Sequence, residues 1–173
     1  KYLAKNNHWS PFEMVNICME IETTRDIARQ ILRHRSFSFQ EFSQRYAAVP
    51  KDGFEYGKAR MQDSKNRQNS LPTDDEELDE WWSHMQHRAT EEAEFIYQAA
   101  LRKGIAKEVA RKVLPEGLTK SRMYMNGTLR SWLHYVSIRC DVATQKEHRD
   151  VALLCKQEIA KAFPSMLEVL NAD

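Results

Sequence analysis

A long helical pattern in the middle of the chain constrains the fold more than any other feature of the sequence. Acidic residues begin the pattern at Asp74, and Arg102-Lys103-Gly104 ends it, as expected for the two ends of one helix. A second helix is predicted over residues 105–114, where Pro115 would stop it. We therefore predict a fold in which helices predominate.

Shorter patterns around these helices add a β component, which makes the predicted class α+β. Met14–Ile21 is rich in apolar residues and partly alternating, which predicts a strand leading into a helix over Thr23–Leu32 that Thr23 or Thr24 caps. Residues 47–72 are typical of an irregular connection with a short strand over Phe54–Met61. Further elements are predicted as an extended segment over Met123–Gly127 and helices over 128–139, over 143–163 and after Pro164.

Composition and charge limit the classes of function. The chain has 173 residues, 42% of them hydrophobic, which suffices for one ordinary core and most simply for one domain over residues 1–173. Its formal net charge of +1 disfavours nonspecific nucleic-acid binding, which usually depends on a large basic excess. No stretch approaches the roughly 20 apolar residues of a membrane span, and no secretory signal is visible. We expect a soluble protein of the cytoplasm, or of the host cytoplasm if a virus encodes it, without a membrane or a nucleic-acid polymer as partner.

The cysteines agree with this expectation. Cys18, Cys140 and Cys155 are odd in number and lack the spacing of zinc ligands. They predict free thiols in a reducing compartment and no metal site.

The stretch from Arg33-His34-Arg35 to Arg45 is the most informative one for function. Its cations, carboxylate and hydroxyls are the groups that bind a phosphorylated ligand rich in hydrogen-bonding atoms. Adjacent helical residues point about 100° apart. The triplet can therefore face one ligand only if the chain unwinds there or if the site is shared with another subunit. The alternative is that the triplet binds no ligand and only forms a cationic helix C-terminus, which the helix dipole favours.

Other candidate residues have structural explanations. One group lies on the predicted long helix: Trp81, Trp82, His84, His87 and Tyr97. Packing and solvent exposure explain that group, because the two histidines have no third metal ligand beside them. Arg130 and His134 share a helix face, and Arg139 falls near the helix end, where the dipole favours a cation. Arg111 fits a surface arginine. Ser43 lacks a His–Asp relay, so its hydroxyl is a hydrogen-bonding group and not a nucleophile.

The triplet Arg33-His34-Arg35, followed after seven residues by Ser43, resembles the signature of the flavin-dependent thymidylate synthases. Nearby residues that also match are Gln30, Glu41, Arg45 and Tyr46. Further similar segments are His8-Trp9-Ser10-Pro11-Phe12-Glu13, Asn66-Arg67-Gln68-Asn69-Ser70, residues 108–115, residues 127–135 and Ile138-Arg139. Met14 departs from the family, since many members have His there. Members usually carry a longer N-terminal segment, and we expect this chain, which begins at Lys1, to lack it.

The resemblance implies a fold, a reaction and a set of site residues. The fold would be a predominantly helical single domain packed with a small antiparallel sheet. The reaction would be reductive methylation of dUMP to dTMP, with methylenetetrahydrofolate as carbon donor, FAD as hydride carrier and NADPH as reductant. The resemblance assigns FAD to Ser10, Arg33, His34, Arg35, Glu41, Arg130 and His134. It assigns dUMP to Gln30, Glu41, Ser43, Arg45, Arg111 and Arg139. Arg139 would be catalytic by polarising the uracil, His8 would line a pocket for folate or nicotinamide, and a homotetramer would form its active sites between subunits.

Two other classes of function remain open. One is a binding module for RNA or phosphorylated ligands that uses the basic cluster without catalysis, although the near-neutral net charge counts against it. The other is a flavoprotein of the same fold without synthase activity, which the departure at Met14 leaves open.

Overall fold

The structure is a computed structural model that describes residues 2–50 and 53–170, and its backbone divides into two units. Unit 1 contains Lys1–Ile21, Arg29–Gln40 and Met123–Asp173. Unit 2 contains Glu22–Ala28 and Glu41–Arg122. Each unit thus combines segments that are distant in sequence, and the single domain over residues 1–173 stays a prediction.

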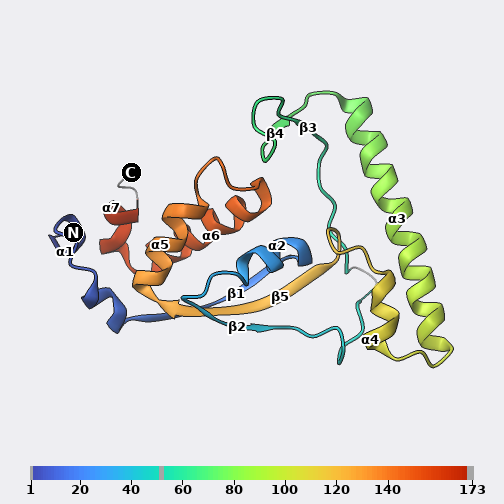
Figure 1. Cartoon of the computed structure of the whole chain (residues 1–173), viewed down its shortest axis with the longest axis horizontal. Helices are drawn as coiled ribbons and strands as arrows, with labels where there is room; N and C mark the ends of the chain where they lie inside the picture. The colour runs from blue at the N-terminus through green and yellow to red at the C-terminus, as the bar shows by residue number, and fades with distance from the viewer. Residues whose placement is uncertain (1, 51–52, 171–173) are drawn as a thin grey trace. The chain divides into compact units, whose positions relative to one another are not determined.

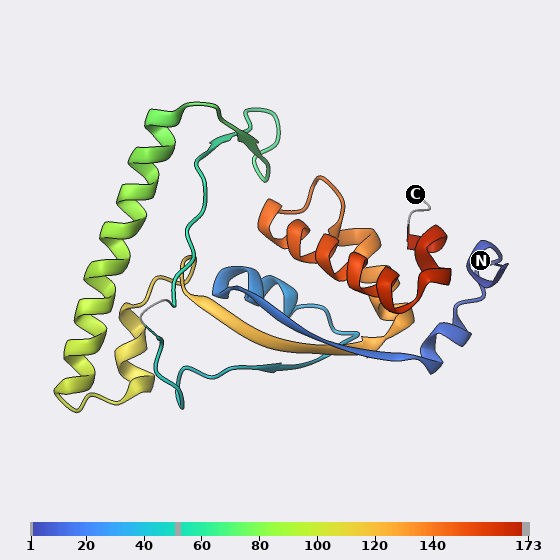
Figure 2. The ribbon, with the colours of Figure 1, turned by 180° about the vertical axis from the view of Figure 1, so that it is seen from behind.

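Helices and short strands follow one another along the described chain (Figures 1 and 2). The α-helices are α1 (Tyr2–Lys5), α2 (Arg25–Ile31), α3 (Glu76–Arg102), α4 (Lys107–Ala110), α5 (Leu129–Arg139), α6 (Lys146–Ala162) and α7 (Leu167–Leu170). The 3-10 helices are η1 (Ser10–Met14), η2 (Arg111–Val113) and η3 (Pro164–Met166). The strands are β1 (Asn16–Thr24), β2 (Ser38–Glu41), β3 (Arg60–Gln62), β4 (Ser70–Pro72) and β5 (Lys120–Thr128). Within the described ranges, no helix combines the length and the apolar character that a membrane span requires.

The largest sheet has three strands in the order β1-β5-β2. Hydrogen bonds just beyond the strand ends join Leu129 N–H to Val15 O at 2.8 Å and Arg25 N–H to Thr119 O at 2.9 Å. Residue numbers rise along β1 as they fall along β5, so these strands run antiparallel. β3 and β4 form a separate antiparallel pair. The predicted α+β class, mainly helical with a small antiparallel sheet, is confirmed.

In unit 1, α5 and α6 lie side by side over one face of the strands (Figures 1 and 2). Trp132 and Tyr135 of α5 are fully buried. The indole Nε1–H of Trp132 donates to Ile17 O at 3.0 Å, which fixes α5 to β1. Thr128 caps the helix, because its Oγ1 accepts from Ser131 N–H at 3.2 Å.

Gly127 of β5 occupies a position with no room for a side chain. A Cβ there would lie 2.5 Å from Cδ1 of Phe37. Phe37 is itself buried and packs edge-to-face on Trp132, with ring centroids 4.9 Å apart. This close approach holds the segment that follows Arg33-His34-Arg35 against the strand.

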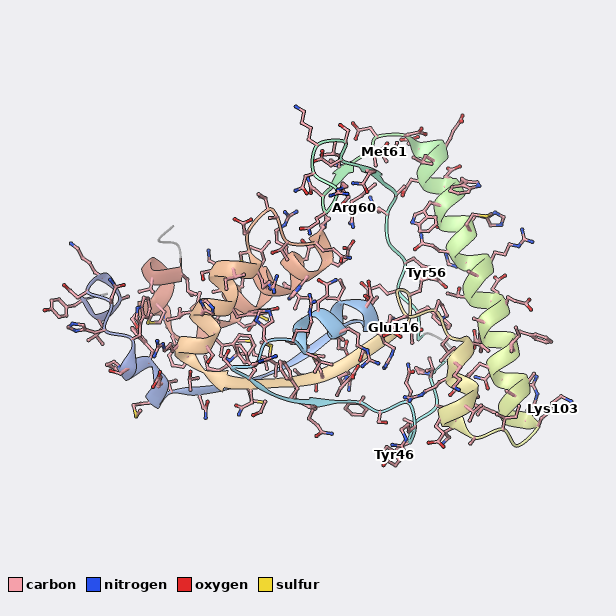
Figure 3. All side chains as sticks on the ribbon, in the orientation of Figure 1. Tyr46, Tyr56, Arg60, Met61, Lys103 and Glu116 are labelled. Carbon is pink, nitrogen blue, oxygen red and sulfur yellow. The ribbon has the colours of Figure 1, made fainter. Side chains whose placement is uncertain are left out.

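In unit 2, α3 ends at Arg102 as predicted and begins at Glu76, slightly after the predicted start at Asp74. Oδ1 of Asp75 accepts from Leu78 N–H at 3.0 Å as the N-cap. The helix ends at Arg102, and Gly104 follows with a φ of 80°, a conformation that suits glycine. Lys103, between them, is labelled in Figure 3.

The inner face of α3 packs on two neighbouring segments. Tyr97 forms a small core with Val49 and with Ala110 of α4, which lies beside α3 in Figures 1 and 2. Further along α3, the buried Gln86 makes two hydrogen bonds to the backbone of Gly57, at 2.9 Å from its N–H and 2.8 Å to its C=O. α3 thereby holds an extended segment that leads to Arg60 and Met61 of β3 (Figure 3).

Three predicted elements differ from the structure. The helix predicted from Thr23 begins at Arg25, because Thr23 and Thr24 complete β1, and β-branched residues suit a strand. The helix predicted over 105–114 is only α4 followed by η2. Its N-terminus lacks a side-chain cap, and Pro115 disfavours a helical residue before it. The strand predicted over Phe54–Met61 is reduced to a bridge between Phe54 and Thr119 and to β3.

Candidate active site

Arg33-His34-Arg35 lies in a turn and not in a helix. α2 ends at Ile31, and tight-turn hydrogen bonds follow, from Arg33 N–H to Gln30 O at 3.3 Å and from His34 N–H to Ile31 O at 3.0 Å. Arg33 and Arg35 are exposed and His34 is half-buried. Of the two alternatives that the sequence leaves open, the structure shows the first, a chain that leaves the helix before the triplet, and a site shared between subunits stays a prediction.

His34 and Arg139 are in direct contact in unit 1. Nε–H of Arg139 donates to Nε2 of His34 at 3.0 Å. Burial first, and then the charges of Arg139, His134 and Arg33, lower the pKa of His34 to about 4. His34 is therefore neutral at pH 7 and can act as the acceptor, which orients Arg139 at the end of α5.

A polar network lies beneath the turn. The fully buried His148 of α6 has Nε2 at 3.1 Å from the Tyr135 hydroxyl and Nδ1 at 3.3 Å from Oε1 of Gln30. The ring of His34 lies edge-on to Tyr135, with centroids 5.0 Å apart. Burial, followed by the charges of Arg139, His34 and Arg33, lowers the pKa of His148 to about 4. The network thus links Gln30, predicted to bind dUMP, to buried groups on two helices.

His148 is not among the site residues predicted from the sequence. A signal exists in its spacing, because Ala152, Cys155 and Ile159 follow it on the buried face of α6. A histidine that shares an apolar helix face needs a buried hydrogen-bond partner. Tyr135 belongs to the family segment over residues 127–135, but its contact with His148 depends on how two helices pack.

A cavity of about 1440 Å³ in unit 1 brings together two predicted FAD ligands, Arg130 and His134. Other residues lining it are Trp9, Glu13, Met14, Ser36, Leu133, Val136 and Leu170. The guanidinium of Arg130 is paired with Glu13 of η1, the element that Ser10 begins. The lining of the cavity combines the cations Arg130 and Lys156, the carboxylates Glu13 and Asp141, an imidazole and apolar side chains. That combination fits a ligand with a planar ring system and phosphate groups.

In unit 2, the predicted ligand Glu41 already has protein partners. Its Oε1 lies 3.5 Å from Nη1 of Arg25 and accepts from Oγ of Ser121 at 2.7 Å. Arg25 is buried, and Glu41 is largely so. These contacts fix the carboxylate at the end of β2.

The other predicted ligands of unit 2 lie on exposed or half-exposed turns. Nε–H of Arg45 donates to Glu108 at 3.2 Å, and its guanidinium lies 5.9 Å from the ring centroid of Tyr46, labelled in Figure 3. Oγ of Ser43 accepts from Arg45 N–H at 3.3 Å. Arg111 begins η2 and is half-buried. Because the Arg45–Glu108 pair is exposed, it is a weak interaction that an anionic ligand can replace.

The predicted site residues are divided between the two units. Unit 1 holds Ser10, Gln30, Arg33, His34, Arg35, Arg130, His134 and Arg139. Unit 2 holds Glu41, Ser43, Arg45 and Arg111. Contacts within unit 1 bring His34 to Arg139 and Gln30 to His148, whereas Arg130 meets Glu13.

The cation-rich turn and the cavity are typical of a protein that binds phosphorylated ligands. The family model described as thymidylate synthase complementing protein, Thy1, matches residues 1–165, and the chain belongs to that family. This finding confirms the family that the sequence motifs predict.

Named relatives agree with this assignment. The chain is 51% identical over 171 residues to a flavin-dependent thymidylate synthase of Synechocystis sp., covering 99% of this chain and 78% of the relative. It is 47% identical over 171 residues to a probable flavin-dependent thymidylate synthase of Paramecium bursaria Chlorella virus 1, with the same coverage of 99% and 78%.

Solved structures share the fold. The UMP/dUMP methylase PolB of Streptomyces cacaoi bound with 5-Br dUMP has a TM-score of 0.84 at 30% identity, covering 96% of this chain and 76% of that one. The same enzyme bound with 5-Br UMP has a TM-score of 0.83 at 29% identity, covering 96% and 78%.

Proposed function

We propose that the chain is a flavin-dependent thymidylate synthase that methylates dUMP to dTMP, with methylenetetrahydrofolate as carbon donor and FAD and NADPH for reduction. The observation that carries the proposal is the exposed turn Arg33-His34-Arg35 against Arg139, in a chain that aligns over 99% of its length with a relative of that name. The activity belongs with the nucleotide pool of the cytoplasm.

FAD binding is supported by the cavity that Arg130 and His134 line and by the cations of the turn Arg33-His34-Arg35. Arg33, Arg35 and Arg130 are exposed residues whose guanidiniums can pair with a pyrophosphate, which for Arg130 means replacing its exposed pair with Glu13. His34 and His134 offer planar partners to the ring system. Bound FAD supplies the hydride chemistry of the reaction. Ser10 and Glu41 complete the proposed set, with Glu41 held by Arg25 and Ser121.

Binding of dUMP is proposed for a second group of residues: Gln30, Glu41, Ser43, Arg45, Arg111 and Arg139. Since Nε of Arg139 is engaged by His34, its terminal nitrogens remain for the ligand. A guanidinium fork on the uracil stabilises negative charge on the carbonyl and ring nitrogen, and so raises electron density at the carbon to be alkylated. Arg139 is the proposed catalytic residue. Arg45 and Arg111 suit the phosphate.

The direct test is dTMP formation by FAD-loaded protein supplied with dUMP, methylenetetrahydrofolate and NADPH, followed by mass spectrometry. We expect dTMP in the complete mixture and none when any one component is omitted. UMP in place of dUMP tests whether the second nucleotide named for PolB is also a substrate. Absence of dTMP from the complete mixture with flavin bound would exclude the proposed function.

The identity of the flavin is a separate test. We expect heat-released cofactor to be FAD, because the exposed cations Arg33, Arg35 and Arg130 exceed what one monophosphate needs. Chromatography of the released flavin distinguishes FAD from FMN. Recovery of FMN alone, or of no flavin after reconstitution, would contradict the assignment.

A further inference from the structure

Tyr135 and His148 form a buried hydrogen-bonded pair, and His148 contacts Gln30. Neither residue of the pair is among the proposed ligand-binding residues. Both residues are fully buried. The pair is one end of a hydrogen-bonded chain that runs through Gln30 and Gln145 to Glu147, all within unit 1. In each of these four hydrogen bonds, the donor and the acceptor can be assigned by starting from the Glu147 carboxylate.

The donor and acceptor roles follow from Glu147. An ionised carboxylate only accepts hydrogen bonds, so the contact of 3.1 Å from Gln145 Nε2 to Glu147 Oε2 makes that Gln145 nitrogen the donor. Oε1 of Gln145 is then the acceptor, and it receives Nε2–H of Gln30 at 2.7 Å. Gln30 is thereby oriented with its amide nitrogen toward Gln145 and its carbonyl oxygen toward His148.

The same logic fixes the tautomer of His148. Oε1 of Gln30 can only accept, so Nδ1 of His148 must carry the proton in their contact of 3.3 Å. A neutral imidazole then has a lone pair on Nε2, which accepts from the Tyr135 hydroxyl at 3.1 Å. Burial keeps both groups neutral, since it lowers the pKa of His148 to about 4 and raises the pKa of Tyr135 above its ordinary value.

We propose that Tyr135 and His148 are positioning residues that lock the Gln30 amide so that its second N–H is presented to an acceptor oxygen of the nucleotide. This inference rests on the proposed binding of dUMP by Gln30. Without the lock the amide could rotate by half a turn and present its carbonyl oxygen, which would repel the same acceptor. Neither positioning residue touches the ligand; both act through Gln30.

Tyr135→Phe is the sharpest variant, because it removes one oxygen and leaves the ring. We expect the KM for dUMP to rise about 3- to 10-fold, the range for one net hydrogen bond, with kcat at saturating dUMP and flavin content within about twofold. Tyr97→Phe is the matched control, since it removes another buried hydroxyl, one that accepts from Val49 N–H in unit 2. We expect that control to leave the KM for dUMP unchanged.

A double-mutant cycle separates positioning from general loosening of the fold. In a Gln30→Leu background there is no amide to orient, so Tyr135→Phe should cause no further rise in the Kd for dUMP. If Tyr135→Phe raises the Kd by the same factor in both backgrounds, Tyr135 does not act through Gln30, and the proposal is overturned.

The tautomer is measured on the wild-type protein, and a variant serves only to assign the signal. In ¹⁵N spectra of histidine-labelled protein, with His148→Gln to assign the signal, we expect His148 protonated on Nδ1 only. A signal protonated on Nε2 would overturn the proposal whatever the enzyme binds. If the tautomer is as expected but wild-type protein does not bind dUMP, the proposed function fails, and with it the nucleotide as the ligand of the Gln30 amide.

Discussion

Two histidines close to arginines are kept neutral in unit 1. His34 accepts a hydrogen bond from Arg139, and His148 bridges Tyr135 and Gln30. A neutral imidazole can accept from a guanidinium, whereas a protonated one would repel it. The positions of the arginine and the glutamine near the turn therefore depend on the protonation state of their neighbours.

This dependence predicts how stability changes with pH. Both histidines have a folded-state pKa of about 4 against an ordinary value of 6.5. Between these values the unfolded chain binds protons that the folded chain does not. The free energy of unfolding should therefore fall as pH drops from about 6.5 toward 4, with no contribution from these groups above that range. Thermal midpoints measured across this interval should depend less steeply on pH in His148→Gln than in wild type. Identical slopes would contradict a lowered pKa for His148.

Arg139→Lys tests the role of the planar fork. Lysine keeps the charge but loses the geometry that lets one nitrogen bind His34 while the others face the ligand. We expect turnover of dUMP to fall by a factor on the order of 10 to 1000, the range for loss of one strong charge-assisted contact, with FAD content near wild type. If the variant loses flavin but retains its affinity for dUMP, Arg139 contacts FAD and its assignment to dUMP is wrong.

Cys140 follows Arg139 and lines the cavity, yet we predict that it forms no covalent bond to substrate. Burial raises the pKa of its thiol, which disfavours the thiolate that a nucleophile needs. Cys140→Ala should retain dTMP formation, and Ser43→Ala should lose mainly dUMP affinity. Intact-protein mass spectra during turnover provide the check, and an adduct on Cys140 would refute the prediction.

At the scale of helices and strands, one glycine has a clear structural requirement. Gly127→Ala would place a Cβ 2.5 Å from the ring of Phe37, which packs on the fully buried Trp132. We expect a loss of about 1–3 kcal/mol in the free energy of unfolding, as for other overpacked cores. Gly117→Ala is the matched control, since nothing lies within 4 Å of its Cβ position, and we expect a change within about 0.5 kcal/mol. Denaturant unfolding of both variants gives the comparison, and equal losses would rule out the steric explanation.

The elements that the sequence predicts well carry their own signals. α3 has the acidic first turn with the Asp75 cap and the glycine stop, and Thr128 caps α5 where the sequence predicts that helix to begin. β2 is not predicted from the sequence, because its four residues are too few for alternation to show. α4 does not extend into the longer predicted helix, because its N-terminus lacks a side-chain cap and Pro115 disfavours a helical residue before it.

The candidate site also has a part that the sequence predicts and a part that it does not. The family motifs predict the residues around Arg33-His34-Arg35, because that turn and its polar groups are local in sequence. The Tyr135–His148 contact joins two helices, and the pairing of Glu41 with Arg25 and Ser121 joins a strand, a helix and a second strand. Such contacts are set by tertiary packing, which no short stretch of sequence encodes.

At the scale of the whole molecule, the proposed ligands of one nucleotide lie in both units. Gln30 and Arg139 belong to unit 1, and Arg45 and Arg111 belong to unit 2. We propose a homotetramer in which each active site takes residues from more than one chain. The proposal would explain how residues that diverge around one turn serve the same ligands.

Subunit mixing tests this arrangement. Arg33→Ala and Arg111→Ala should each be nearly inactive alone. If the two arginines at one site come from different chains, mixing the variants under conditions that exchange subunits should restore part of the dTMP-forming activity. A monomer by light scattering with full flavin occupancy would contradict the shared site.

The hydrogen bonds between Gln86 and the backbone of Gly57 affect which residues these two positions can accept. The two hydrogen bonds reach only the backbone N–H and C=O of Gly57, which every residue except proline possesses. A Cβ at Gly57 would have its nearest neighbour 4.0 Å away, so alanine fits there without displacing anything. Gln86 cannot be replaced in this way, because glutamate lacks the N–H that donates to Gly57 O, and the side chain of asparagine is one methylene shorter. The two hydrogen bonds therefore restrict the residue at position 86 more than the residue at position 57.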